Sequence, residues 1–233
     1  EWFADATFAR NRNKVIELYE GIDEYSLDGY WNYGNTRIGS MAIVGGDYGV
    51  LMSDSNPKLY NNEEDPNDPL NGMPLLTWSN GQRGAYLERN YEKEIVGNMN
   101  PDFTGSITTG FSYKNFRISA LFDFKIGGDI STYSGRYGSA YGLFESTLDK
   151  RDAASGGLTW TSSWTGNQYE DGYIPDGVFK DGTIVDMKDA QGNVIHNDVS
   201  GLTYKQAYDQ GLIEPTHVNY WYYRVNSWSR GVI

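Results

Sequence analysis

Few side chains in this sequence have the types and spacing that catalysis requires. The two histidines, His196 and His217, are not spaced as metal ligands are, and the chain contains no cysteine. The lack of thiols excludes disulfide frameworks and thiolate metal sites. Serine, aspartate and glutamate are present, but no arrangement of them singles out a hydrolase. The sequence therefore predicts a protein that is not an enzyme.

Aromatic side chains offer a different kind of chemistry, because Phe, Trp and Tyr make up 15% of the residues. An aromatic ring can stack on the apolar C–H face of a sugar, while nearby Asp, Asn and Arg side chains bond to its hydroxyl groups. The alternative interpretation is that the rings hold long loops together or contact a partner protein. The candidate substrate-binding residues are Trp78, Trp160, Trp164 and Trp221.

Two further stretches have compositions that occur at ligand sites. Residues 61–72 are acidic and could coordinate Ca²⁺, but their spacing matches no known calcium loop. A solvated turn is the preferred interpretation there, and we expect no cofactor. A group of glycines suggests a phosphate-binding loop, but no helix pattern follows it, so we reject that interpretation for Gly45, Gly46 and Gly49.

Charge and hydropathy limit the classes of partner. The net charge of −12 at pH 7 argues against nucleic acid and anionic lipid. The chain has no run of about 20 apolar residues, so it predicts no transmembrane helix. Strands remain as a way to cross a membrane, because a barrel strand needs only about ten alternating residues.

The clearest element lies in residues 102–130, where two runs of eleven residues alternate between apolar and polar side chains. Successive side chains of a strand point to opposite faces, so each run has one apolar face. A two-residue turn at 114–115 pairs Tyr113 with Phe116 and brings both apolar faces to the same side. A shift of one residue would destroy this match. The pattern predicts a β-hairpin.

The dimensions of this hairpin suit a membrane barrel. Eleven residues at a rise of about 3.3 Å, tilted by about 45°, cover about 25 Å along the membrane normal. Aromatic residues lie at both ends of the apolar face, as they do in the girdles of a barrel wall. A soluble β-sandwich has the same period of two, so the hairpin alone leaves both architectures open.

The remaining residues give weaker signals. Residues 1–18 predict a second strand, residues 36–52 a strand or hairpin, residues 203–211 a short helix with a capping box, and residues 228–233 the start of another strand. Otherwise residues 19–101 and 129–225 lack sustained periodicity and predict long, irregular loops. Outer-membrane barrels have such loops, whereas a sandwich needs about seven regularly spaced strands. The pattern therefore favours the barrel.

Seven short motifs, which cover most of the chain in a consistent order, resemble the late barrel region of the SusC/RagA-type TonB-dependent transporters. In the sequence they read FxxNxNK at 8–14, GGxYG at 45–49, GNxNPDF at 97–103, FSYKNF at 111–116, GGDI at 127–130, IPDGVF at 174–179 and WSRGVI at 228–233.

The resemblance implies an all-β fold, in which the chain is a segment of a large antiparallel transmembrane β-barrel of the 22-stranded type. Its strands lie near 1–18, 102–113, 116–128 and 228–233. Residues 19–101 and 129–225 are then long extracellular loops, with one short loop helix. The N-terminal plug and the final strands are not in this sequence.

The resemblance also implies a function and partners. A transporter of this family imports glycans or oligopeptides across the outer membrane of Bacteroidetes. The TonB–ExbB–ExbD complex supplies energy through the N-terminal part, and a SusD-like surface lipoprotein covers the barrel.

In such a barrel the two faces of the hairpin meet different surroundings. The face that meets outer-membrane lipid contains Phe103, Ile107, Phe111, Ile118, Phe122 and Phe124. The face that meets the aqueous lumen contains Arg117, Asp123 and Lys125.

Two other readings of the sequence remain open. The first is a secreted carbohydrate-binding module, a soluble β-sandwich with an aromatic platform. The second is a surface structural protein without a ligand. The adjoining sequence on both sides, or expression of residues 1–233 alone, would distinguish these alternatives from the importer.

Overall fold

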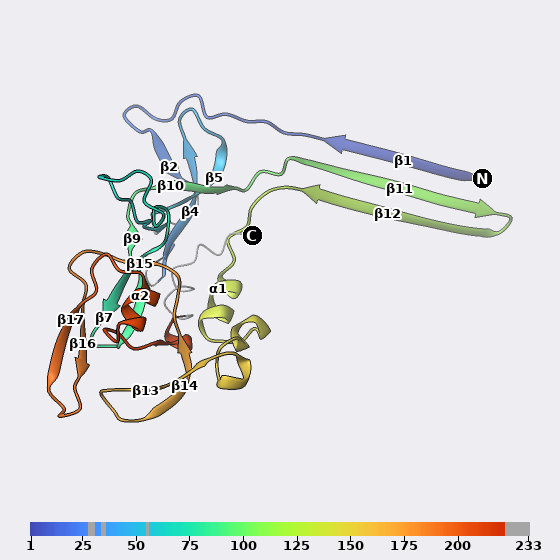
Figure 1. Cartoon of the computed structure of the whole chain (residues 1–233). Helices are drawn as coiled ribbons and strands as arrows, with labels where there is room; N and C mark the ends of the chain where they lie inside the picture. The colour runs from blue at the N-terminus through green and yellow to red at the C-terminus, as the bar shows by residue number, and fades with distance from the viewer. Residues whose placement is uncertain (28–30, 34–35, 55, 222–233) are drawn as a thin grey trace.

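A computed structural model describes residues 1–27, 31–33, 36–54 and 56–221. The described residues are mostly strands, with two short α-helices and two 3-10 helices. Figure 1 shows a long three-stranded sheet, here called the arm, that projects from a compact body. This content agrees with the predicted all-β class, although the described residues do not form a closed barrel.

The arm consists of β1 (Trp2–Ala9), β11 (Phe103–Tyr113) and β12 (Phe116–Ile126), in the antiparallel order β1-β11-β12. Tyr113 pairs with Phe116 and Phe103 with Ile126, without a register shift between them. This register confirms the predicted hairpin. The tight turn requires Lys114 to adopt a left-handed conformation with φ of 52°.

One face of the arm is apolar over all three strands. β1 pairs with β11 so that Trp2 lies opposite Phe111 and Phe8 opposite Gly105, which adds the apolar face of β1 to that of the hairpin. Phe103 contacts Phe8 at a ring-centroid distance of 5.4 Å and Phe124 at 6.3 Å, which forms one aromatic group at the body end. The aromatic residues at the opposite end are Trp2, Phe111, Tyr113 and Phe116.

The apolar face is open to its surroundings. Ile107, Phe111, Ile118 and Phe122 are between 44% and 61% exposed. The opposite face is mainly polar, and there the hydroxyl groups of Thr7 and Ser106 hydrogen-bond across the strands at 2.7 Å. A soluble protein rarely leaves an apolar face of this extent uncovered.

The N-terminal strand is shorter than predicted. It ends at Ala9, whereas the sequence predicted a strand over residues 1–18. Beyond it, the backbone of Val15 bonds to the turn of another hairpin, through its N–H to Gly46 O at 2.9 Å and its carbonyl to Gly45 N at 2.8 Å. The chain therefore leaves the arm and joins the body soon after the apolar alternation stops.

A five-stranded sheet forms the part of the body next to the arm. It contains β2 (Glu24–Ser26), β3 (Trp31–Tyr33), β4 (Thr36–Ile43), β5 (Tyr48–Ser53) and β10 (Glu94–Asn98). For residues 36–52 the sequence predicted a strand or a hairpin, and the antiparallel pairing of β4 with β5 shows a hairpin. Its buried hydrophobic cluster contains Met41, Val50 and Met52.

The main core lies around a second sheet of the body. β7 (Leu75–Ser79) pairs with β8 (Gly84–Leu87) and, in parallel, with β15 (Val178–Phe179). Helix α2 (Tyr204–Asp209) supplies the fully buried Tyr204 and Ala207 to this core. The other buried members are Leu76, Trp78, Ala85, Leu87, Phe179, Val185, Val199 and Ile213.

Shorter elements complete the body. The two-stranded sheets are β6 (Asn56–Pro57) with β9 (Arg89–Asn90), and β16 (Ile184–Lys188) with β17 (Val194–Asp198). A three-stranded sheet contains β13 (Leu158–Thr161), β14 (Gln168–Tyr173) and β18 (Thr216–His217). The helical segments are α1 (Tyr133–Ala140), η1 (Glu145–Leu148) and η2 (Ala153–Ser155).

The predicted long loops are therefore not irregular. The described residues of 19–101 and 129–221 fold together around a common core, in which Leu76 on one segment pairs with Phe179 on the other. The predicted helix at 203–211 is confirmed, with both capping-box bonds between Thr203 and Gln206. Helix α1 was not predicted, because its sequence is rich in Gly and Ser and gives no clear apolar stripe. The strand predicted near 228–233 lies outside the described residues.

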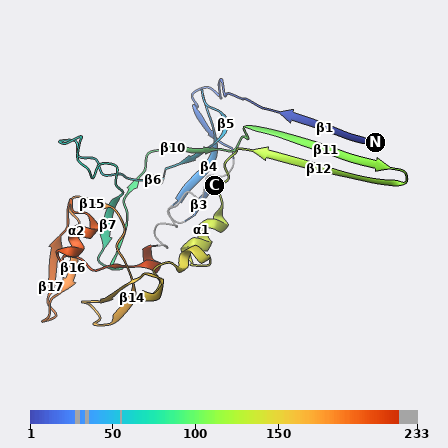
Figure 2. The same cartoon turned by 45° about the vertical axis from the view of Figure 1, so that its right-hand side comes forward.

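The connections of the arm are arranged asymmetrically. The two-residue turn at 114–115 and the N-terminus lie at the free end of the arm, and both long segments leave from the other end (Figures 1 and 2). The connection between strands at the free end is therefore a tight turn, whereas the connections at the other end form the body. Outer-membrane barrels have this asymmetry between short periplasmic turns and long outer loops.

Candidate functional site

The first candidate region is the junction between the arm and the body. Asp129, which follows β12, bonds to Asn98 at the end of β10. The Asp129 backbone N–H donates to Asn98 O at 2.7 Å, and the Asp129 carboxylate accepts the Asn98 N–H at 2.7 Å. These two bonds hold the chain entering the hairpin against the chain leaving it.

Side chains from two more segments join this network. The Asn98 amide donates to the Asp47 carboxylate at 2.8 Å, and the Asn100 amide donates to Tyr48 O at 2.5 Å. The Asn13 side chain accepts the Tyr48 N–H at 2.6 Å. Four of the motifs that carry the family resemblance, at 8–14, 45–49, 97–103 and 127–130, therefore meet at this junction. Their polar residues fix the body on the arm.

A polar cavity of about 320 Å³ lies beside the junction. Arg10 and Arg12 line it together with Asp47 and Asp102, so charges of both signs face the same space. Both arginines are exposed and come just after Ala9, the last residue of β1. The basic residues therefore begin where the strand ends.

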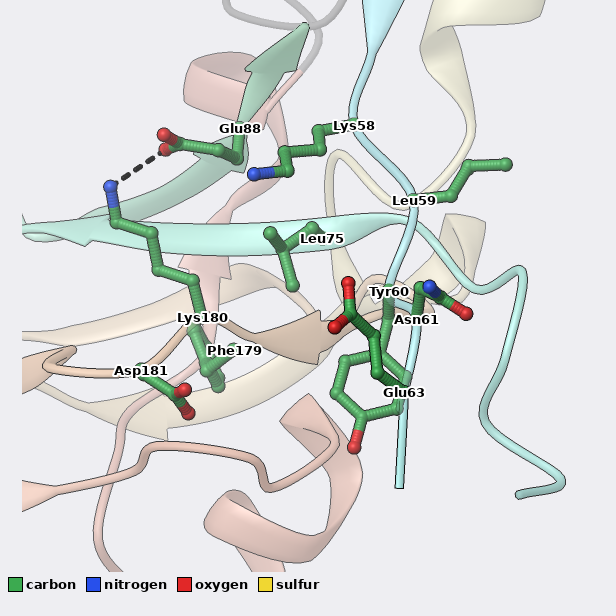
Figure 3. Close-up of a pocket in the computed structure, with 10 residues that line it drawn as sticks. All are labelled: Lys58, Leu59, Tyr60, Asn61, Glu63, Leu75, Glu88, Phe179, Lys180 and Asp181. Carbon is green, nitrogen blue, oxygen red and sulfur yellow. Dashed lines mark hydrogen bonds and ion pairs between the residues drawn. The ribbon is translucent and has the colours of Figure 1, made fainter. Parts of the chain in front are cut away.

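The second candidate region is a larger pocket in the body, with a volume of about 460 Å³ (Figure 3). This volume is within the range of small-molecule sites, which is roughly 300–1,000 Å³. Its lining comes from three separate parts of the chain: Lys58, Leu59, Tyr60, Asn61 and Glu63, then Leu75 and Glu88, and finally Phe179, Lys180 and Asp181.

Backbone hydrogen bonds hold the pocket lining in place. Lys58 N donates to Glu88 O, Leu75 N to Lys58 O and Glu88 N to Leu75 O, each at 2.8 Å. Lys180 N donates to Leu76 O at 2.9 Å. The segments that carry Lys58, Glu88 and Lys180 are therefore held in place by the sheet, as a preformed binding site requires.

The charges of the pocket are only partly compensated. The Lys180 ammonium and the Glu88 carboxylate form an ion pair at 2.9 Å, drawn as the dashed line in Figure 3. Within the described part of the chain, Lys58, Glu63 and Asp181 form no ion pair. One cation and two anions thus remain available in a space that also has an apolar floor at Leu75.

The acidic loop at 61–72 forms one wall of this pocket and is closed by its own hydrogen bonds. Asp68 accepts bonds from the Asn62 amide at 2.9 Å, from Leu70 N at 2.9 Å and from the Tyr60 hydroxyl at 3.4 Å. The Asn62 bond, followed by the Leu70 bond, lowers the pKa of Asp68. Desolvation and then the charge of Asp68 raise the pKa of Tyr60.

The acidic composition of this loop also suggested a calcium site. Its Asp65 and Asp68 carboxylates accept N–H groups of the loop itself, from Asn67 and from Leu70. Among the described residues no group of three or more His, Asp or Glu side chains is arranged to hold a metal ion. These two carboxylates are therefore bonded within the loop itself.

Two of the four candidate tryptophans are buried. Trp78 and Trp160 are each 9% exposed. Trp78 belongs to the main core, and Trp160 lies against Tyr169 and His217 at ring-centroid distances of 5.2 and 5.1 Å. Neither ring has an open face for a sugar in this structure.

The other two tryptophans also make contacts within the body. The Arg83 guanidinium lies 4.5 Å and the Lys188 ammonium 5.0 Å from the Trp164 ring centroid, and the Trp164 indole N–H donates to Asp186 O at 3.1 Å. Trp221 packs against the main core and contacts Tyr173 edge to face at 5.9 Å. These contacts favour the alternative interpretation, in which the rings hold the long segments together.

Sequence reasoning missed the pocket in the body. Lys58 and Lys180 are far apart in the sequence and lie in no recognisable motif. The one available signal was the acidic composition of residues 61–72, which does line the pocket through Glu63. The parallel pairing of β7 with β15 brings the segments together. A contact between residues so far apart in the sequence produces no local sequence pattern.

Comparison with known proteins adds one finding. No family model matches the chain. The chain is similar to "TonB-dependent receptor P3" of Formosa agariphila, with 27% identity over 141 residues, which are 57% of this chain and 14% of that receptor. This similarity supports a relationship to the TonB-dependent receptors. The matched region is a small part of the receptor's length.

The relationship agrees with the structure at a coarse level. TonB-dependent receptors are outer-membrane transport proteins and not an enzyme family, and the arm has the alternating strands that such proteins use. Within the described residues, no helix is long and apolar enough to cross a membrane.

Proposed function

We propose that this chain is part of an outer-membrane TonB-dependent importer of the SusC/RagA type, which takes up glycans or oligopeptides. The arm forms part of the barrel wall, and the body forms its extracellular part. The observation that carries the proposal is the arm itself, a sheet with one continuous exposed apolar face, aromatic residues at both ends and a two-residue turn at its free end.

The two faces of the arm then have different roles. The lipid-facing residues are those of the apolar face, among them Ile107, Ile118 and Phe122. Arg117, Asp123 and Lys125 lie on the opposite face and point into the aqueous lumen. In lipid every backbone polar group must be paired, so the outer edges of β1 and β12 pair with further strands of the barrel. The sheet described here ends at these two strands.

The partners follow from the same proposal. The TonB–ExbB–ExbD complex provides the energy for import, through a part of the receptor outside this sequence. A SusD-like lipoprotein covers the body on the cell surface. Support for these partners comes from the motif resemblance, and the structured body offers a folded surface where a lid could dock.

The alternative, a secreted carbohydrate-binding module, is less well supported. Such a module folds as a soluble β-sandwich in which the apolar face of one sheet is covered by another. In the described part of the chain the apolar face of the arm has no covering sheet, and Trp78 and Trp160 are buried.

Expression of residues 1–233 alone tests the proposal. We expect this product to aggregate or to require detergent, because the described residues leave the apolar face uncovered and pair no further strand with either edge of the arm. A monomer that unfolds cooperatively without detergent would contradict the barrel assignment and favour the secreted module. In cells, loss of the receptor should abolish uptake of a glycan or oligopeptide, and the complete gene should restore it.

A further inference from the structure

We propose that the pocket between the segments at 58–63, 75–88 and 179–181 binds the end of a short zwitterionic peptide. Lys58 meets a carboxylate of the ligand, and Glu63 and Asp181 meet an ammonium group. The inference rests on the proposed import function, since it identifies which of the two substrate classes the body is built to meet.

The first argument is the distribution of charge. In the view of Figure 3 the ammonium groups of Lys58 and Lys180 lie on one side of Leu75, and the carboxylates of Glu63 and Asp181 lie on the other. Glu88 neutralises Lys180 through their ion pair. Lys58 on one side of Leu75 and two carboxylates on the other, which lie apart from each other beside Tyr60 and Lys180, are left without an ion pair, so the pocket has a polarity of its own.

This polarity discriminates between ligand classes. A neutral oligosaccharide would leave three charged groups without a counter-charge once it displaced water from them, which is unfavourable. A purely anionic ligand would be repelled by the carboxylates of Glu63 and Asp181. A purely cationic ligand would be repelled by the ammonium group of Lys58. A ligand with both charges avoids these repulsions, since like-charge contacts penalise the wrong partner.

The second argument is the floor of the pocket. Leu75 is 8% exposed and Leu59, which also lines the pocket, is 53% exposed, so the pocket has apolar surface beside its charged groups. The Asn61 side chain and the Tyr60 hydroxyl add polar groups at the edge, and Tyr60 is held by its bond to Asp68. A peptide combines an apolar side chain with terminal charges and backbone hydrogen-bonding groups, which matches this lining.

The third argument is the rigidity of the frame. Lys58, Leu75, Glu88 and Lys180 are connected through backbone hydrogen bonds between three segments. The acidic loop at 61–72 is braced internally, where the Asn71 side chain accepts the Asn62 N–H at 2.7 Å and donates to Asp65 O at 3.1 Å. A preformed site loses little conformational freedom on binding.

The test uses the complete receptor purified in detergent and isothermal titration with four probes. These are trialanine, N-acetyl-trialanine, trialanine amide and maltotriose. Trialanine should bind, and blocking either terminus should weaken binding by roughly tenfold or more, because each block removes a charged hydrogen-bonding partner. Maltotriose should bind no better than the blocked peptides at this site.

Variants assign each end of the ligand. Lys58→Met should abolish the difference between trialanine and its amide, while Asp181→Asn should reduce the difference between trialanine and its N-acetyl form. Lys205→Met and Asp209→Asn are matched controls, because this exposed pair lies on α2, outside the pocket lining. The readout is a ratio of two affinities, so a general loss of folding would not imitate it.

The outcomes separate the two proposals. Equal affinity for free and blocked trialanine, no detectable binding of trialanine, or unchanged ratios in Lys58→Met would each overturn the peptide inference. Uptake and surface exposure of the body are measured on the same cells. A receptor that is exposed and imports its substrate but fails the ratio test would contradict the pocket inference alone.

Discussion

Phe122 is the single residue that best reports on the surroundings of the arm. It lies opposite Ile107 within β12, and its side chain is 61% exposed on the apolar face. A Phe122→Arg variant should impair insertion, because an arginine near the bilayer midplane of a barrel costs about 2–4 kcal/mol. Folding into lipid vesicles measures this loss through the fraction that resists protease.

Ser119→Arg is the matched control for that prediction. Ser119 lies on the opposite face of the same strand, which we assign to the lumen. Insertion of Ser119→Arg should remain near the level of the unmodified protein. Normal insertion of Phe122→Arg together with failure of Ser119→Arg would mean that the two faces are reversed.

The stability of the loop at 61–72 should depend on pH, because hydrogen bonds lower the pKa of the Asp68 carboxyl group. A carboxyl group with a lowered pKa stabilises the folded state above its unfolded pKa of about 3.9, and this contribution is lost as pH falls through the folded value. The loop at 61–72 should therefore be protected at neutral pH and open below about pH 4. Hydrogen exchange at Leu70 N–H, corrected for intrinsic rates, measures the opening.

Asp68→Asn should remove most of this pH dependence and open the loop at neutral pH as well. Glu64→Gln is the control, because Glu64 lies in the same loop and is exposed. If Leu70 N–H exchanged equally in both variants, the Asp68 carboxylate would not be the group that closes the loop.

Single residues also show where sequence reasoning reached its limit. The sequence suggested that Trp78 and Trp160 could stack on a ligand, yet both are buried. Residue type gives the chemistry that a side chain is capable of, but its exposure depends on contacts from other segments. For Trp160 those contacts come from Tyr169 and from His217, which lies far along the chain.

Elements with strong local signals were predicted well. The hairpin of β11 and β12 has an alternating pattern on both strands and a two-residue turn, so its register follows from local sequence alone. Helix α2 was equally clear, because Thr203 and Gln206 form a capping box just before an apolar stripe. The end of β1 was predicted too late, since Arg10 and Arg12 do not by themselves show that the chain turns away from the sheet.

The cap of α2 gives a prediction at the scale of the element. The Thr203 hydroxyl accepts the Gln206 N–H at 3.1 Å, and the Gln206 side chain accepts the Thr203 N–H at 2.8 Å. Thr203→Ala should destabilise the helix by about 1 kcal/mol, the usual effect of losing such a cap. Hydrogen exchange at Gln206 N–H measures the local free energy of opening. Thr203→Ser keeps the hydroxyl acceptor, so its protection should stay close to the original; equal losses in both variants would exclude the cap as the cause.

The body shows why a fold at the scale of the whole molecule resists prediction. Its strands are short, two to six residues in most cases, and its decisive contact is the parallel pairing of β7 with β15. The pocket depends on that pairing, because it places Lys180 opposite Lys58 and Glu88. Local periodicity of apolar residues does not predict such long-range contacts. The sequence therefore suggested loops where the chain folds around a core.

The asymmetry of the whole molecule leads to a prediction about its orientation in the membrane. The body and the turn at 114–115 lie at opposite ends of the arm (Figure 1). The eleven-residue strands β11 and β12 are long enough to span the apolar band of an outer membrane. An epitope tag inserted between Ala190 and Gln191, at the exposed tip of the β16–β17 hairpin, should bind antibody on intact cells. A tag inserted between Lys114 and Asn115 should bind antibody only after the outer membrane is permeabilised.

If the turn tag were labelled on intact cells and the hairpin tag were not, the orientation would be the reverse. If both tags were labelled on intact cells, the arm would not span the membrane, and the barrel assignment would fail.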